Sequence, residues 1–173
     1  MKIAIIGTNS RAEAIRKLVA TGGYEVSVAG KVTDRAAGEE AAKVLDSDVL
    51  ILAGSPEAGD GLVGQAGRFR PESIIIDAMD GRADRSAAEA FARSLGSNRI
   101  VRALMMVPDP GANILCCGDD ADAMNVVKEI FRNCGCIPTD RGPLSNVDEL
   151  EPPSGSLDEE FDTLKARNTV VSS

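Results

Sequence analysis

A short turn near the start of the sequence has the residue types that hold phosphate groups. It consists of Gly7, Thr8, Asn9, Ser10, Arg11 and Ala12. In the dinucleotide-binding pattern G-x-G-x-x-G/A, the first glycine allows a tight turn and the second lets the backbone approach the diphosphate. The last small residue lets the helix pack on the strand. Gly7 and Ala12 match the outer positions of this pattern.

The middle position of the turn departs from the pattern, because Asn9 replaces the second glycine. Asparagine tolerates unusual backbone dihedrals better than most residues, but its side chain occupies space that the diphosphate would use. Arg11 could compensate as a charged phosphate donor. We interpret the turn as nucleotide-binding; the alternative is an ordinary strand–helix connection.

The end of the second predicted strand indicates which dinucleotide is bound. An NAD site carries Asp or Glu there, for the ribose hydroxyls, whereas a cation favours the 2′-phosphate of NADP. The sequence has Lys31 at this point and no acidic residue before Asp34. Lys31 therefore favours NADP, and the alternative is a solvated surface lysine.

The sequence contains no histidine, which excludes several kinds of chemistry. Histidine-based triads, histidine-ligated metal sites and imidazole proton shuttles are ruled out. Hydride transfer between organic cofactors needs the fewest catalytic side chains, because the reacting atoms belong to the ligands. The net charge of −8, from 19 basic and 27 acidic residues, disfavours a broad surface for nucleic acid or anionic membranes.

Two pairs of cysteines are further candidates for chemistry. Cys116 and Cys117 are adjacent, so on a strand they point to opposite faces and cannot readily bind one ion together. Cys134 and Cys136 alone fall short of a zinc signature. We therefore expect buried, inert thiols and no metal site.

Charged residues at three further places have both functional and structural interpretations. Residues 77–81 end a predicted strand, so Asp77 and Asp80 could be catalytic, or they could form a turn or cap a helix. Residues 119–122 carry aspartates that are typical of a helix start rather than of a metal site. Arg99 and Arg102 could pair with carboxylates on the acidic surface, and we assign them no functional role.

Apolar patterning places these candidates on alternating strands and helices. Short apolar runs predict strands at residues 1–7, 24–29, 48–53, 73–77, 99–104, 113–117 and 136–139. Helical spacing predicts helices at residues 10–20, 36–45, 86–95 and 121–133. This alternation predicts an α/β fold with a Rossmann-like, doubly wound, mostly parallel sheet and helices on both faces. The connection at residues 31–47 has room for one helix and hardly for a further strand.

The composition divides the chain in two. We expect a Rossmann-like dinucleotide-binding domain at residues 1–150 and an acidic linker with a short C-terminal tail at residues 151–173. Leu157, Phe161 and Leu164 have the spacing of one helical face, so the tail either stays partly disordered or docks as a helix. No run approaches the roughly 18 apolar residues of a membrane span, and the start lacks a signal-type core, so we expect a cytoplasmic protein.

Three stretches of the sequence resemble one family of reductases. They are residues 2–8 with residues 23–26, residues 100–104 leading to residues 107–108, and residues 117–120 with residues 140–146. By these motifs the sequence is similar to the NADP-dependent reductases that use the deazaflavin coenzyme factor 420. The resemblance covers most of residues 1–150. It implies a Rossmann domain that passes hydride between the nicotinamide and the deazaflavin.

The resemblance also implies site residues. The diphosphate would contact Thr8, Asn9, Ser10 and Arg11. Lys31 would meet the 2′-phosphate, and the cofactor would lie beside Ser55 and Pro56. The deazaflavin side would be lined by Met105, Met106, Val107 and Pro108, although the two methionines could equally fill the core.

The sequence departs from this family at positions that concern activity. Besides Asn9, Val32 stands where a second cation is expected, and Met105 replaces a histidine. We expect NADP as cofactor, a deazaflavin or a similar molecule as acceptor, and a homodimer in which a second subunit completes the open cleft. The alternative is a non-catalytic nucleotide-binding or assembly protein that keeps the Rossmann fold.

Overall fold

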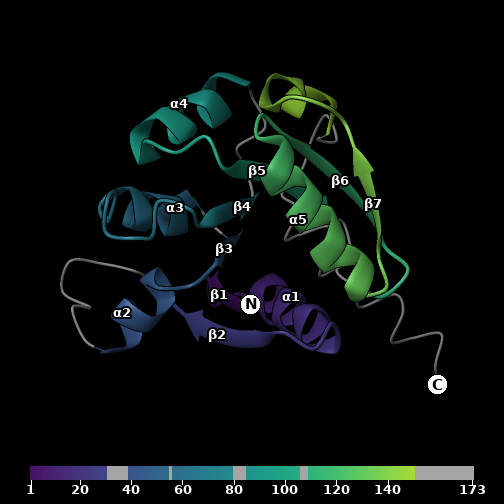
Figure 1. Ribbon diagram of the computed structural model, residues 1–173, viewed down its shortest axis with the longest axis horizontal. Helices are drawn as coiled ribbons and strands as arrows, with labels where there is room; N and C mark the ends of the chain where they lie inside the picture. The colour runs from purple at the N-terminus through teal and green to yellow at the C-terminus, as the bar shows by residue number, and fades with distance from the viewer. Residues whose placement is uncertain (31–38, 55, 80–84, 106–108, 151–173) are drawn as a thin grey trace.

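The computed structural model of the 173-residue chain describes residues 1–150, apart from residues 31–38, 55, 80–84 and 106–108. Strands and helices alternate along most of this part (Figure 1). The strands are β1 (Lys2–Ile6), β2 (Glu25–Ala29), β3 (Val49–Gly54), β4 (Ile74–Met79), β5 (Ile100–Met105), β6 (Asn113–Gly118) and β7 (Ile137–Asp140). The helices are α1 (Ser10–Thr21), α2 (Glu39–Leu45), α3 (Pro56–Val63), α4 (Arg85–Leu95), α5 (Ala121–Asn133) and the 3-10 helix η1 (Leu144–Glu149).

The strands form one seven-stranded sheet in the order β2-β1-β3-β4-β5-β6-β7. The strands from β2 to β5 in this order are parallel. The chain leaves β1 toward β2 on one side and then crosses back to β3 on the other side. Ligands of open α/β sheets bind outside the carboxyl ends of the strands at such a reversal. The predicted doubly wound, mostly parallel sheet is confirmed, and the described part of the 31–47 connection contains α2.

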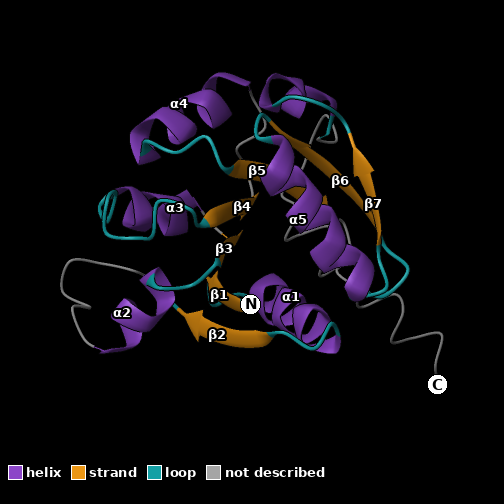
Figure 2. Ribbon diagram, viewed as in Figure 1, coloured by secondary structure: helices purple, strands orange, loops and turns teal. Residues whose placement is uncertain are grey.

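Helices cover both faces of the sheet (Figures 1 and 2). Strand side chains alternate between the faces. Ile51 therefore packs in one core with Phe131 of α5, and its neighbour Leu52 packs in the other core with Phe91 of α4. Both faces of the central strands are buried, as their continuous apolar runs predict. In the part of the chain that the structure describes, no helix is long and apolar enough to cross a membrane.

The last part of the sheet runs the other way. β6 is antiparallel to β5, because residues 106–112 are too few for a crossover, which needs about a dozen residues or more. β7 then pairs parallel with β6 through α5. The carboxyl ends of β6 and β7 therefore lie at the amino edge of the other strands. A hollow of about 350 Å³ opens there, lined in part by Gly118, Met124, Lys128 and Asp140.

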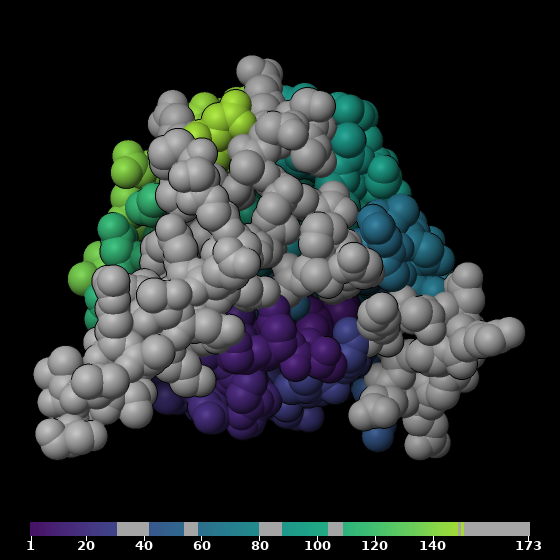
Figure 3. Space-filling model, turned by 180° about the vertical axis from the view of Figure 1, so that it is seen from behind, coloured from purple at the N-terminus to yellow at the C-terminus, as the bar shows by residue number. Residues whose placement is uncertain are grey.

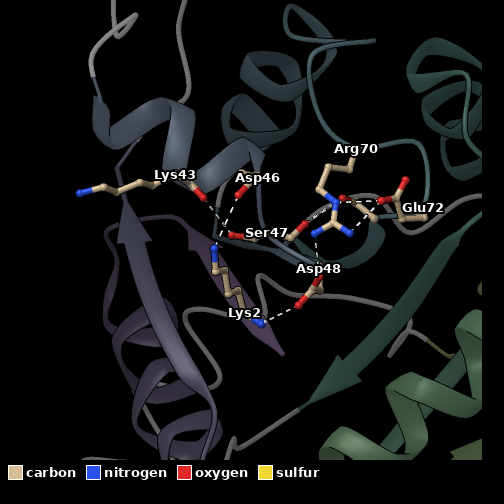
Figure 4. Close-up of polar contacts among 8 residues, drawn as sticks. Lys2, Lys43, Asp46, Ser47, Asp48, Arg70 and Glu72 are labelled. Atoms are coloured by element: carbon tan, nitrogen blue, oxygen red, sulfur yellow. Dashed lines mark hydrogen bonds and ion pairs between the residues drawn. The ribbon is translucent and has the colours of Figure 1, made fainter.

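Charged side chains tie the amino ends of the central strands together (Figure 4). Asp48, just before β3, accepts hydrogen bonds from the backbone N–H of Lys2 and from Arg70 Nη1, both at 2.8 Å. Arg70 Nε also donates to Glu72 at 2.9 Å, and Lys2 Nζ lies 3.6 Å from Asp46. The hydrogen bond from Lys2, together with the charge of Arg70, lowers the pKa of Asp48. This network joins β1, β3 and the segment before β4 at one edge of the sheet.

Two elements were absent from the predicted pattern. α3 begins at Pro56, which suits a first helical position, but Gly59 and Gly61 lower the helix propensity of the segment and interrupt its apolar spacing. η1 is a short 3-10 turn, for which the sequence has no recognisable period. It packs Leu144 and Val147 against β6 and α4.

Candidate functional site

The glycine turn joins β1 to α1 at the carboxyl edge of the parallel strands. Gly7 has a φ of +149°, and its N–H donates to the carbonyl of Ala29, at the end of β2, at 2.9 Å. A Cβ on Gly7 would lie 1.9 Å from the carbonyl oxygen of Ala53 in β3. The backbone conformation and the approach of β3 both require glycine here. The first position of the turn thus has the role that the sequence pattern predicts.

Asn9 caps the start of α1. Its φ of −80° and ψ of 174° are extended, so this position needs no unusual backbone conformation, contrary to one argument for asparagine here. Its Oδ1 accepts the N–H of Ala12 at 2.8 Å, and asparagine is among the preferred residues for such a cap. The first-turn amides of a helix attract phosphate. The Asn9 side chain therefore engages one of the groups that a diphosphate would use.

The other described residues of the turn differ in their exposure. Ala12 is 2% exposed, and its Cβ lies 3.3 Å from the Cβ that Gly7 lacks, which is the close helix–strand packing predicted for this position. Arg11, in the same turn of α1, is 0% exposed. Thr8 and Ser10 are exposed. The turn therefore has two exposed hydroxyl-bearing residues beside a buried arginine.

Many of the remaining predicted site residues fall outside the described residues, namely Lys31, Ser55, Met106, Val107 and Pro108. Pro56 is the first residue of α3, and Met105 is the last residue of β5. The backbone of both therefore lies at the same carboxyl edge as the glycine turn.

Seen from behind, the N-terminal residues (purple) form the lower middle of the molecule, and the α3 and α4 regions (blue and teal) lie along one side (Figure 3).

A buried ion pair lies between β4 and β5 near this edge. Arg102 Nη1 lies 2.9 Å from Asp77 Oδ1, and the two side chains are 1% and 2% exposed. The same Arg102 nitrogen donates to the carbonyl of Met79 at 2.7 Å, and the N–H of Met79 donates to Asp77 Oδ1 at 3.1 Å. The expectation that Arg102 pairs on the acidic surface is wrong, because its strand is covered on both faces. The sequence did contain a sign of this pair, because each of the two apolar strands contains one charged residue.

The cysteines are free and buried. Cys116 packs in the core beneath α5, and Cys117 packs beneath η1, so they point to opposite faces as predicted. Burial raises the pKa of both thiols to about 12, and that of Cys134 to about 11. These thiols therefore stay protonated near neutral pH. Among the described residues, no cluster of three or more His, Cys, Asp or Glu could hold a metal ion.

The aspartates that precede α5 have structural roles, as expected. Asp120 caps the helix by accepting the N–H of Ala123 at 2.7 Å, and Asp119 accepts the N–H of Leu144 at 2.9 Å. Arg99 Nη1 lies 3.6 Å from Asp120, so the expected pairing of Arg99 with a carboxylate is confirmed. These groups lie at the opposite edge of the sheet from the glycine turn.

Solved structures share this architecture. The prephenate dehydrogenase of Aquifex aeolicus has a TM-score of 0.64 at 12% identity, over 82% of this chain and 61% of that protein. The Streptomyces aurantiacus imine reductase has a TM-score of 0.67 at 16% identity, over 87% and 60%. The imine reductase of Myxococcus stipitatus, in complex with NADP+, has a TM-score of 0.62 at 13% identity, over 99% and 63%. The chain has the Rossmann fold.

These likenesses concern the fold, because the identities are low. The chain spans about three fifths of the length of each of these three proteins. A scan against protein-family models gave no match, and a search of curated proteins gave none either.

Proposed function

We propose that the protein binds NADP(H) at the glycine turn and acts as an oxidoreductase. The observation that carries this proposal is the turn itself. Gly7 packs against the Ala53 carbonyl, and the first turn of α1 follows at the point where the strand order reverses. Helix amino ends at such reversals bind diphosphates. The NADP+ complex of a similarly folded imine reductase supports the same cofactor here.

Thr8, Asn9, Ser10 and Arg11 remain the proposed diphosphate contacts. Thr8 and Ser10 are exposed residues, and a hydroxyl can donate to a phosphate oxygen. Arg11 is fully buried, so its guanidinium would have to become accessible before it could contact the phosphates. Asn9 accepts from the amide of Ala12, so a phosphate that uses this amide must displace the cap. We therefore expect moderate affinity rather than tight binding.

The two ends of the dinucleotide would lie on either side of the turn. We propose that Lys31, which follows β2, binds the 2′-phosphate of the adenosine half. Ser55 and Pro56, which follow β3, would lie beside the cofactor. The acceptor would lie against Met105, Met106, Val107 and Pro108 at the end of β5. By the resemblance described above, a deazaflavin is the acceptor to test first.

Hydride transfer requires the two ligands to be oriented and does not require a catalytic acid or base from the protein. The bound nicotinamide would supply the hydride. The chain has no histidine, and three of its thiols have pKa values of about 11 or 12. Its residues would therefore bind and orient the two ligands and exclude water between them. We also propose that a second copy of the chain covers the carboxyl edge, as a homodimer.

Fluorescence titration with NADPH and NADH tests this proposal. We expect a dissociation constant in the micromolar range for NADPH and weaker binding of NADH. Lys31→Ala should weaken NADPH binding about tenfold, because a charged hydrogen bond to the 2′-phosphate is lost. The same variant should leave NADH binding unchanged, so NADH serves as the matched control. Absent or millimolar binding of both nucleotides by the wild-type protein would overturn the proposal.

A second function, a non-catalytic nucleotide-binding or assembly protein, is favoured by the Asn9 cap and by Met105 in place of a polar residue. Mixing the NADPH-loaded protein with oxidised deazaflavin separates the two. Catalysed bleaching of the deazaflavin absorbance supports the reductase. NADPH binding without bleaching removes the deazaflavin from the proposal, and binding without turnover on any acceptor favours the second function.

A further inference from the structure

The backbone pairing between β4 and β5 stops before either strand ends. Among the residues that the structure describes, the last pair of this ladder is Asp77 with Arg102. β4 stays paired with β3 as far as Met79, opposite Gly54. β5 stays paired with β6 as far as Met105. The two strands therefore part from each other at the carboxyl edge of the sheet.

The buried ion pair takes over where this ladder stops. A backbone N–H and C=O at the end of a strand need partners when they are buried. The carbonyl of Met79 accepts from Arg102 Nη1, and its N–H donates to Asp77 Oδ1. Arg102 also donates to Asp77, so three hydrogen bonds close one small network. The side chains of this pair thus hold both backbone groups of the last residue of β4.

Stability alone does not account for this pair. Two charges lose their hydration when they are buried, and well-packed apolar residues of similar size often stabilise a core as well or better. The neighbouring strand positions on this face carry such residues, as Leu52 and Ile75 do. An apolar pair at these two positions would fill the core, but it could not bind the N–H and C=O of Met79. The charged pair therefore contributes something an apolar pair could not: it fixes the backbone at the end of β4.

This end lies where the second half of a dinucleotide must go. The argument rests on the proposed function, with the diphosphate at the end of β1 and the 2′-phosphate after β2. The nicotinamide half then extends the other way, over the ends of β3 and β4. β4 lies two strands from β1, at about 10 Å.

We propose that Asp77 and Arg102 are positioning residues for the nicotinamide half of the cofactor. They touch no ligand themselves. They fix the backbone at the end of β4, where β4 and β5 separate. The part of the sheet edge that would contact the nicotinamide therefore keeps a single conformation.

A binding experiment with two ligands tests this role. The double variant Asp77→Leu/Arg102→Met replaces the ion pair with apolar residues and is expected to fold, because no charge is left buried alone. We expect NADPH to bind it about tenfold more weakly than the wild type. Adenosine 2′,5′-bisphosphate, which has only the adenosine half, should bind both proteins within a factor of two. Hydrogen exchange at the amide of Met79 should become faster in the variant.

The control and the contrary outcomes are distinct. Lys128→Met removes another ion pair that links a helix to the sheet, Lys128 with Asp140 at 2.8 Å, and should change the binding of neither ligand. Equal weakening of both ligands in the double variant would indicate general damage, and unchanged NADPH binding would leave the pair without a positioning role. Either result overturns the inference. Failure of the wild-type protein to bind either ligand overturns the proposed function instead, and this inference with it.

Discussion

The two edges of the sheet use polar groups in opposite ways. At the amino edge, charged side chains at the surface bind one another and the strand ends, with Asp48 at the centre between Lys2 and Arg70. At the carboxyl edge, the turn after β1 depends on a glycine, a helix cap and the close approach of β3. The ion pair near that edge is fully buried. At the amino edge, solvent-exposed charged side chains bind one another. At the carboxyl edge, the backbone of the glycine turn and a buried ion pair determine the structure.

We expect this difference to decide which edge a ligand uses. Around Asp48 at the amino edge, the side chains already bind one another, so they contribute modestly to stability and leave few polar groups for a ligand. A backbone turn at a helix start presents N–H groups that other anions can share with the cap. Changes at the carboxyl edge should therefore affect NADPH binding, and changes in the network around Asp48 should affect stability alone.

The largest effect is expected at Gly7. Gly7→Ala adds a Cβ 1.9 Å from the carbonyl oxygen of Ala53 and forces a non-glycine residue to a φ of +149°. The end of β3 must move or the turn must rearrange, so we expect a loss of about 3 kcal/mol or more in the free energy of unfolding. NADPH binding should be lost as well. Urea denaturation and NADPH titration measure the two effects.

Gly23→Ala is the matched control for this change. Gly23 also has a positive φ, of +78°, but a Cβ there meets nothing within 4 Å. Only the backbone strain remains, which costs about 1 kcal/mol, and NADPH binding should not change. If the two alanine variants were equally stable, the approach of β3 would not be what requires glycine in the turn.

The sequence predicts the framework better than the details that shape the site. Strands such as Ile74–Met79 were predicted within two residues of each end, because burial on both faces leaves a continuous apolar run. The cap at Asn9 could also have been predicted, since asparagine directly before a helix is a common start signal. The pairing of Asp77 with Arg102 could not, because it depends on the register between two strands that are 25 residues apart in the chain.

A smaller effect than at Gly7 is expected at Asn9, where stability and NADPH affinity should change in opposite directions. Asn9→Ala removes the cap on the N–H of Ala12 and should cost about 1 kcal/mol in the free energy of unfolding. The released amide becomes available to phosphate, so NADPH should bind several-fold more tightly. Asn9→Asp keeps a cap but adds negative charge, and should weaken NADPH about tenfold without loss of stability. Weaker binding by the alanine variant would instead mean that Asn9 contacts the phosphates through its side chain, and not through its backbone alone.

The smallest effect is expected at Asp48, and it should depend on pH. The pKa of this carboxyl is lowered in the folded state by its hydrogen bond from Lys2 and by Arg70. A lowered pKa contributes stability that is fully present above the unfolded value of about 4 and is lost as pH falls through the folded value. Asp48 is 36% exposed, so solvent screening limits this contribution to about 1 kcal/mol or less.

The side-chain amide in the Asp48→Asn variant cannot titrate, so this variant should be less stable than the wild type at pH 7. The difference should begin to close as pH falls below about 5 and should shrink further as pH passes the lowered pKa of the folded state. Urea denaturation at several pH values measures this, with NADPH binding at pH 7 expected to stay unchanged. A difference that stays constant with pH would show that the ionised carboxyl is not the stabilising group. A change in NADPH affinity would show that the amino edge reaches the ligand site, and the division between the two edges would fail.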